Sequence, residues 1–149
     1  MKKFKFNLEA VLKHRKLIQE QKERELAQAK AALIKEQESL VALEREFSNN
    51  IDEFIRSLNS RLSVTEVILF NNYQTSLKSR IKAQAIKVSE TERQCAHKRS
   101  QLERAMQDSE VIDSLKDKAR DKFQAEASLL EQKMIDDLTT TAFARKQGR

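Results

Sequence analysis

The side chains that could perform acid–base or metal chemistry are few and scattered. His14 and His97 lie 83 residues apart, and Cys95 precedes His97 by two positions, which places the two on different faces of a helix. Asp136 and Asp137 are adjacent and fit a solvated surface. Catalysis requires polar groups that converge in a water-excluding pocket, and no such set is visible. We therefore expect no enzymatic activity, no metal site and no cofactor.

One polar constellation has a structural meaning. Ser63 and Glu66 have the S-x-x-E spacing of a helix capping box, and Leu62 with Val67 fits a hydrophobic staple around it. Together they predict a turn at about 59–63 and a helix start at about 64. One continuous helix with a weak point is the alternative, although so long a helix needs a partner for its apolar stripe.

Composition restricts the elements to helices. The 149 residues include one Gly, Gly148, and no Pro or Trp, and 35% of them are charged. Hairpin turns and phosphate-binding loops need glycine or proline that this chain lacks. The expected fold class is all-α: two long helices forming an antiparallel coiled coil, in one domain over 1–149.

The first helix, about 5–58, carries an interrupted apolar stripe. Polar Glu36 interrupts the stripe, and the charged residues Arg15 and Lys22 weaken the beginning of the stripe. Two consecutive four-residue steps around Phe47 predict a stutter, which locally unwinds a coiled coil. The apolar members are Leu8, Val11, Ile18, Leu26, Ala29, Leu33, Leu40, Leu43, Phe47, Ile51, Phe54, Leu58 and Leu62.

The second helix, about 64–145, has a heptad stripe of lower quality. Ser109 and Lys116 are polar members of the grid, and Ile112 with Leu115 predicts a locally shifted stripe. The apolar grid positions are Leu77, Ile81, Val88, Cys95, Leu102, Phe123 and Leu130.

The unequal helix lengths predict an overhang. A turn near residue 61 places residue 5 beside about residue 117, so roughly the last 25 to 30 residues would project beyond the first helix. Unpaired apolar side chains there predict an interface with another molecule. The alternatives to such an interface are that the first helix pairs further along the second, or that the C-terminal tail folds back or frays. The side chains concerned are Phe123, Leu129, Leu130, Met134, Leu138 and Phe143.

Charge suggests acidic partners. The net charge is +6, and residues 78–104 hold eight Lys or Arg against three Glu. A solvated surface partly paired with Glu36, Glu38, Glu44 and Glu46 is one interpretation. Nucleic-acid or ribosome binding is the other, and the lack of interleaved aromatics counts against binding of single strands. A passive coiled-coil scaffold is a further alternative for the function. With a single Cys, no secretory signal and no membrane-spanning stretch, the expected location is the cytoplasm.

Three segments resemble the FliJ family of the bacterial flagellar type III export apparatus. The opening at 4–13 resembles the family's F-x-F-x-L start, and Asn72-Tyr73-Gln74 is similar to its N-Y-Q block. Residues 131–138, followed by 142–146, resemble the C-terminal end of the family's sequences. The stalk proteins of virulence injectisomes share the expected shape, so the flagellar assignment depends on these motifs.

The resemblance implies a function and partners. FliJ proteins are antiparallel coiled coils similar to the rotor stalk of F-type ATP synthase, and they enter the hexameric export ATPase. They also bind the export gate protein FlhA and escort export chaperones, at the inner membrane beneath the flagellum. When the family's contacts are carried over to this sequence, the ATPase contact falls on Phe123, Leu130, Met134 and Leu138. The gate contact falls on Phe70, Tyr73, Leu77 and Ile81, where Ser76 and Arg80 depart from the family's apolar pattern.

Overall fold

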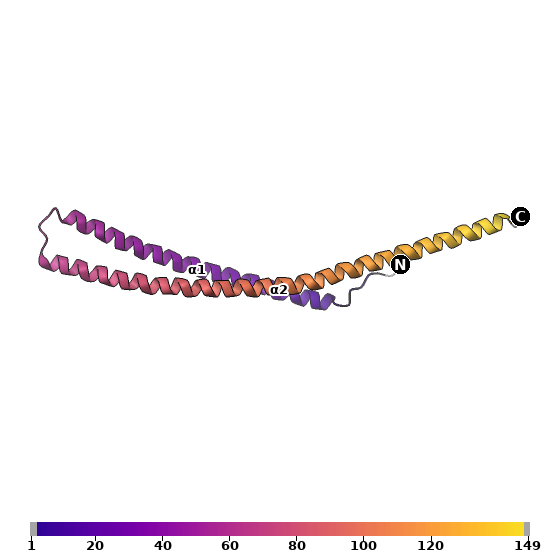
Figure 1. Ribbon diagram of the computed structural model, residues 1–149, viewed down its shortest axis with the longest axis horizontal. Helices are drawn as coiled ribbons and strands as arrows, with labels where there is room; N and C mark the ends of the chain where they lie inside the picture. The colour runs from indigo at the N-terminus through magenta and orange to yellow at the C-terminus, as the bar shows by residue number, and fades with distance from the viewer. Residues whose placement is uncertain (1–2, 148–149) are drawn as a thin grey trace. The chain divides into compact units, whose positions relative to one another are not determined.

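The structure, a computed structural model, describes residues 3–147 as two long helices (Figure 1). Helix α1 is Glu9–Ser57 and helix α2 is Val64–Gln147, with 49 and 84 residues, and no strand occurs among the described residues. The all-α prediction of two long helices packed against each other is confirmed. No helix in this part of the chain is long and apolar enough to cross a membrane.

The contacts group the described residues into two units. The hairpin unit comprises residues 20–104, and the terminal unit comprises residues 3–19 and 105–147. The sequence predicted one domain and gave no sign of this division. Each unit is described by itself below.

In the hairpin unit the two helices pair antiparallel, as the contacting residues show. Phe54 stacks on Phe70 near the turn, with ring centroids 3.9 Å apart, and Glu25 meets Lys98 at the far end of the unit. The buried stripe of α2 runs through Gln74, Leu77 and Cys95, and Leu77 has no exposed surface. The stripe therefore has the predicted heptad spacing, with a polar residue among its buried members.

The stutter predicted near Phe47 is not required. Asn50 is half-buried and takes the three-residue step after Phe47, and its side-chain oxygen accepts a hydrogen bond from Gln74. The sequence reading passed over Asn50 because its side chain is polar and Ile51 follows it. This bond pairs the Gln74 amide N–H with the Asn50 oxygen across the helices, so the regular 3-4 spacing can continue through Asn50 to Phe54, with Ile51 half-buried beside it.

The turn occupies residues 58–63 and ends in the predicted capping box. The Ser63 backbone N–H donates to the Glu66 carboxylate at 2.7 Å, and the Glu66 N–H donates to Ser63 Oγ at 3.2 Å. Hydrogen bonding to the carboxylate, from the Ser63 backbone N–H first and from the Ser63 side chain second, holds the pKa of Glu66 below its usual value. The start of α2 at Val64 is confirmed. Leu62 is half-buried and Val67 is 42% exposed, and the staple between them stays a prediction.

In the terminal unit the buried residues are Leu12, Ala105 and Ser109. The sequence placed Leu8 and Val11 on the stripe, and this was wrong by one position, since they are 38% and 39% exposed. Leu12 shares a face with Arg15, three residues on, whose guanidinium reaches Asp108 at 3.1 Å. Arg15 therefore belongs to the stripe, because its charge is paired at the helix interface. From its residue type alone, the sequence predicted that Arg15 interrupts the stripe.

The predicted shift of the α2 stripe does not occur either. Ser109 is buried and Lys116 is half-buried. Of the two residues of the predicted shift, Leu115 remains 44% exposed, and Ile112 is half-buried at the regular three-residue step after Ser109. The Lys116 ammonium meets the Glu9 carboxylate at 2.8 Å, which explains how a lysine holds a stripe position. The original heptad grid therefore continues to Phe123, which is half-buried.

The first helix begins at Glu9, not at about residue 5. Residues 3–6 are not helical, and exposure alternates there, with Phe4 and Phe6 half-buried and Lys3 and Lys5 exposed. This alternation is typical of an extended segment with one face packed. The Phe4 ring lies 5.6 Å from the Phe123 ring, so packing of the aromatic residues outweighs helix propensity.

This extended segment also changes the pairing predicted for the ends of the helices. Extended chain rises about 3.3 Å per residue and helix about 1.5 Å. The chain between Glu9 and Phe4 therefore reaches from Lys116 to Phe123, whereas the sequence placed residue 5 beside about 117. Phe123 consequently has an intramolecular partner, and its predicted place among the unpaired residues was wrong.

We predict that Ser63→Ala lowers the free energy of unfolding by about 1 kcal/mol, because it removes one bond of the capping box at the start of α2. Urea unfolding followed by circular dichroism measures this. Ser100→Ala, at an exposed position within α2, is the matched control and should cost nothing. Equal stability of both variants would show that the box contributes no stability.

Candidate interaction surfaces

The C-terminal part of α2 presents an apolar stripe in the terminal unit. Beyond Phe123 the side chains of Leu130, Met134 and Leu138 are 62%, 66% and 69% exposed. They follow one another at helical spacings of four, on the same face as Phe123 seven residues before Leu130. We call these three residues the free stripe. It continues the packed stripe of α2 beyond Phe123, which packs against Phe4 of the extended segment 3–6.

Other exposed apolar side chains of this segment lie on different faces of α2. Leu129 and Phe143 are 59% and 65% exposed, at spacings that place them away from the free stripe. Ile135 is 61% exposed and was not singled out from the sequence, because it falls off the heptad grid. These residues are as accessible as the free stripe, so they provide matched controls for it.

Three ion pairs close the terminal unit before the free stripe begins. Lys116 pairs with Glu9, Arg15 with Asp108 at 3.1 Å, and Lys16 with Asp113 at 3.6 Å. The hydrogen bond from Lys116 holds the pKa of the Glu9 carboxyl below its usual value. The side chains of these pairs are between 24% and 56% exposed, so these contacts align the helices more than they stabilise them.

The residues predicted for the gate contact contribute mainly to the helix pair. Leu77 is fully buried, Ile81 is half-buried, and Phe70 stacks on Phe54. Tyr73 is 38% exposed, and its hydroxyl donates to the Glu46 carboxylate, which raises the pKa of the phenol. Of the four, Tyr73 is therefore the most accessible to another molecule.

An open groove lies beside Tyr73 in the hairpin unit. Its lining combines carboxylates, amides and one arginine: Ala42, Arg45, Glu46, Asn49, Asn50, Glu53 and Tyr73. The amides and carboxylates of α1 were not predicted as a surface, because only their contact with α2 brings them beside Tyr73. The groove therefore offers hydrogen-bonding groups around a single aromatic side chain.

Exposed apolar residues also surround the turn. Val64, Ile68 and Leu69 are 76%, 54% and 62% exposed at the start of α2, and Ile55 and Leu58 are 55% and 56% exposed at the end of α1. This region is the densest apolar cluster in the sequence. The heptad spacing half-buries Phe70 against Phe54 and leaves its neighbours exposed, so hydrophobicity alone did not identify the residues of the helix interface.

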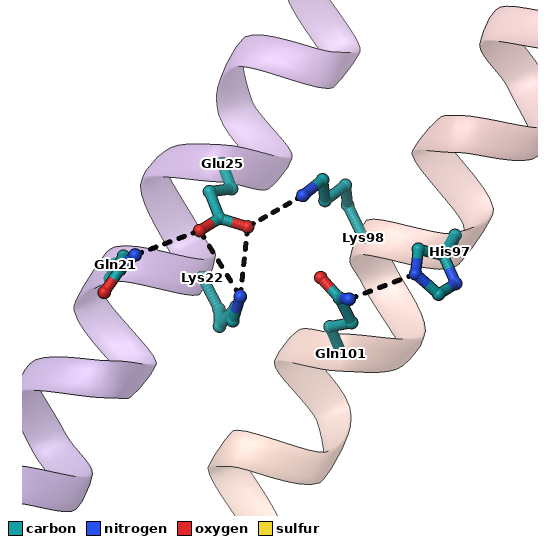
Figure 2. Close-up of polar contacts among 6 residues, drawn as sticks. All are labelled: Gln21, Lys22, Glu25, His97, Lys98 and Gln101. Atoms are coloured by element: carbon teal, nitrogen blue, oxygen red, sulfur yellow. Dashed lines mark hydrogen bonds and ion pairs between the residues drawn. The ribbon is translucent and has the colours of Figure 1, made fainter.

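Polar groups cross the helix interface in the hairpin unit. Figure 2 shows Glu25 of α1 between two lysines, with Lys98 Nζ at 2.9 Å and Lys22 Nζ at 3.2 Å from the same carboxylate oxygen. Further along, Gln84 donates to the backbone oxygen of Glu36 at 3.0 Å and also to its carboxylate. Polar contacts of this kind select one register of a coiled coil, because a slipped register leaves them unpaired.

The predicted pairing of the basic stretch 78–104 with α1 is wrong for the glutamates that were named. Glu36 accepts from Gln84 and Glu46 accepts from Tyr73, neither of which is a cation. Lys98 does pair with a glutamate, but with Glu25. Lys78 lies 6.0 Å from the centre of the Phe47 ring. Most cations of this stretch therefore remain unneutralised by α1.

No group of three or more His, Cys, Asp or Glu side chains within residues 3–147 is placed to hold a metal ion. Cys95 is buried on the heptad stripe, where the sequence placed it as a small apolar residue. His97 lies close to Gln101 on α2, with 3.0 Å between the side-chain nitrogens (Figure 2).

The Glu25 cluster makes stability dependent on pH. Hydrogen bonds from Lys98 and then Lys22 lower the pKa of Glu25 to about 2. Since this pKa lies below the unfolded value of 4.5, the cluster stabilises the fold above pH 4.5 and is lost as the pH falls toward 2. We therefore predict that Glu25→Gln flattens the acid side of the melting temperature profile.

Melting temperatures measured by circular dichroism between about pH 7 and pH 3 test this. Glu38→Gln, at an exposed position of the same helix, is the control and should follow the wild-type profile. If Glu25→Gln follows that profile too, the carboxylate contributes no pH-dependent stability.

The model of the family described as "Flagellar FliJ protein" matches residues 4–148. No curated protein and no solved structure matches the chain. The matched range includes the extended segment, both helices and the free stripe.

Proposed function

The chain belongs to the flagellar FliJ family, and from this premise we propose that it is the stalk of the flagellar export ATPase. The family is a non-enzymatic component of the flagellar protein export apparatus. The proposed role is to enter the hexameric ATPase ring with the C-terminal part of α2 and to promote ATP hydrolysis there.

The observation that carries this proposal is the free stripe. Leu130, Met134 and Leu138 continue a packed helical stripe into a region where no described residue of the terminal unit covers them. Apolar side chains at this spacing favour an interface with another protein, since burial of each leucine contributes about 1.5–3 kcal/mol. The interior of a protein ring is a surface of suitable chemistry.

The proposed mechanism is differential binding. One stalk in a ring of six subunits contacts them unequally, and it favours whichever nucleotide state forms the better contact. The free energy for this comes from the difference in contact between states and requires no chemistry from the stalk itself. The net charge of +6 would accelerate association with acidic walls and make that association sensitive to salt.

We further propose that the hairpin unit links the ATPase to the export gate protein FlhA. Tyr73 and the groove beside it are the accessible part of the region that the resemblance assigns to this contact. Escort of export chaperones, and a cytoplasmic position peripheral to the inner membrane at the flagellar base, belong to the same proposal. The family membership is their support.

We predict that Leu130→Asp combined with Leu138→Asp abolishes stimulation of the flagellar ATPase of the same organism. Loss of two leucines that the ring would bury should raise the concentration needed for half-maximal stimulation roughly 100-fold or more, so stimulation should be absent at concentrations where the wild type saturates. Steady-state ATP hydrolysis, titrated with each protein, measures this. Helicity should be unchanged, because both residues are exposed in the terminal unit.

The control is Leu129→Asp combined with Phe143→Asp, which makes the same change on other faces of the same segment. It should stimulate as the wild type does. Truncation after residue 126 removes the free stripe but retains Phe123 and its contact with Phe4, and it should eliminate stimulation. Full stimulation by the truncated protein would exclude the free stripe as the contact.

A further inference from the structure

One flank of the helix pair in the hairpin unit is apolar and exposed. The interface stripes of α1 and α2 take positions a and d of a heptad, so positions b and e of each helix lie together on one side of its stripe. Exposed large apolar side chains occupy these positions, with between 49% and 76% of their surface accessible. On α1 they are Ile34, Val41, Ile55 and Leu58, and on α2 they are Val64 and Ile68. We call these residues the apolar flank.

The two helices present this flank on the same side of the pair. In an antiparallel pair the equivalent flanking positions of the two helices meet, and Glu46 and Tyr73, both at position g, are hydrogen-bonded on one side. Positions e of α1 and α2 therefore lie along the other side, away from the groove beside Tyr73. The apolar flank is thus a different surface from the one assigned to the gate contact.

Charged residues of the same flank alternate in sign between the helices. Position e carries Lys30 and Glu44 on α1, and Lys78 and Glu92 on α2. Within the described part of the chain, none of these four side chains forms an ion pair. The contacts of Gln74 and Lys98 with α1 set the pairing of the hairpin, and this pairing places each cation level with a carboxylate of the other helix. Each helix therefore complements the charge pattern of the other helix.

We propose that the apolar flank is the interface of a homodimer, in which α1 of one copy packs against α2 of the other about a two-fold axis parallel to the helices. Because this axis keeps residues at the same level, Ile55 packs against the partner subunit's Ile68, and Leu58 against the partner subunit's Val64. Glu44 faces the partner subunit's Lys78. This proposal concerns the hairpin unit alone and does not depend on the stalk role.

The size and charge of the flank fit a second copy better than other partners. From Lys30 to Leu58 the flank is about 42 Å long, and two adjacent helices of about 10 Å each make it about 20 Å wide. A second copy would cover about 800 Å² of each chain, which is a standard protein interface. A single helix would cover only part of this width. Charges of both signs disfavour a polyanion such as nucleic acid or anionic lipid.

The test is the molar mass of the full chain, measured by sedimentation equilibrium over a concentration series. The wild type should dimerise. Ile55→Asp combined with Ile68→Asp should raise the dimer dissociation constant at least about 100-fold, because the dimer then loses four buried apolar side chains. Circular dichroism should show unchanged helicity, since both residues are exposed in the hairpin unit.

The matched control is Leu69→Asp combined with Ile86→Asp, which makes the same change in the same unit at residues that are 62% and 55% exposed but lie off the flank. It should dimerise as the wild type does. The free-stripe variant Leu130→Asp combined with Leu138→Asp should dimerise as well. A monomer at every concentration would overturn the proposal, and so would equal loss in the flank variant and its control, or loss in the free-stripe variant.

A charge exchange tests the arrangement of the two copies. Glu44→Lys places like charges opposite each other across the two-fold axis, and so does Lys78→Glu, so each variant alone should dimerise roughly tenfold more weakly. An equimolar mixture of the two variants restores both attractive pairs and should recover the wild-type dissociation constant. If the mixture dimerises no better than either variant alone, α1 does not face α2 of the partner.

Discussion

The structure depends on the need of each long helix to bury a narrow stripe against another segment. Isolated helices are marginal in water, and most of their stability comes from packing one face. In the hairpin unit α1 and α2 satisfy this need for each other, with Leu26 on one helix and Leu77 and Cys95 on the other. In the terminal unit Leu12 is buried as well, and the extended segment with Phe4 continues the packing to Phe123.

The stripes are poor in large apolar residues, and polar contacts take many of their positions. Gln74 with Asn50, Gln84 with Glu36, and Lys98 with Glu25 all lie at the helix interface of the hairpin unit. Such pairs add little net stability, because desolvation opposes their attraction. They penalise every register that leaves them unpaired, so they give a marginal helix pair a single alignment.

The same constraint leaves two surfaces for other molecules. Where the partner segment ends, the stripe of α2 continues as Leu130, Met134 and Leu138, which are exposed. Where the partner is present, one flank of the pair remains apolar and exposed. The stalk role that we propose needs both a paired part and an accessible end, and one helix longer than its partner supplies both.

The sequence by itself determined the elements. The absence of proline, the single glycine and the Ser63–Glu66 box predicted two helices and the start of the second, because these depend on local backbone preferences and local hydrogen bonds. It also predicted exposure of the free stripe, which follows from unequal helix lengths. Only the tertiary structure decided which residues face the partner: Leu12 in place of Val11, Ser109 buried, and Phe4 extended onto Phe123. These depend on contacts between residues nearly one hundred or more positions apart, and a polar side chain joins the core only when such a contact satisfies it.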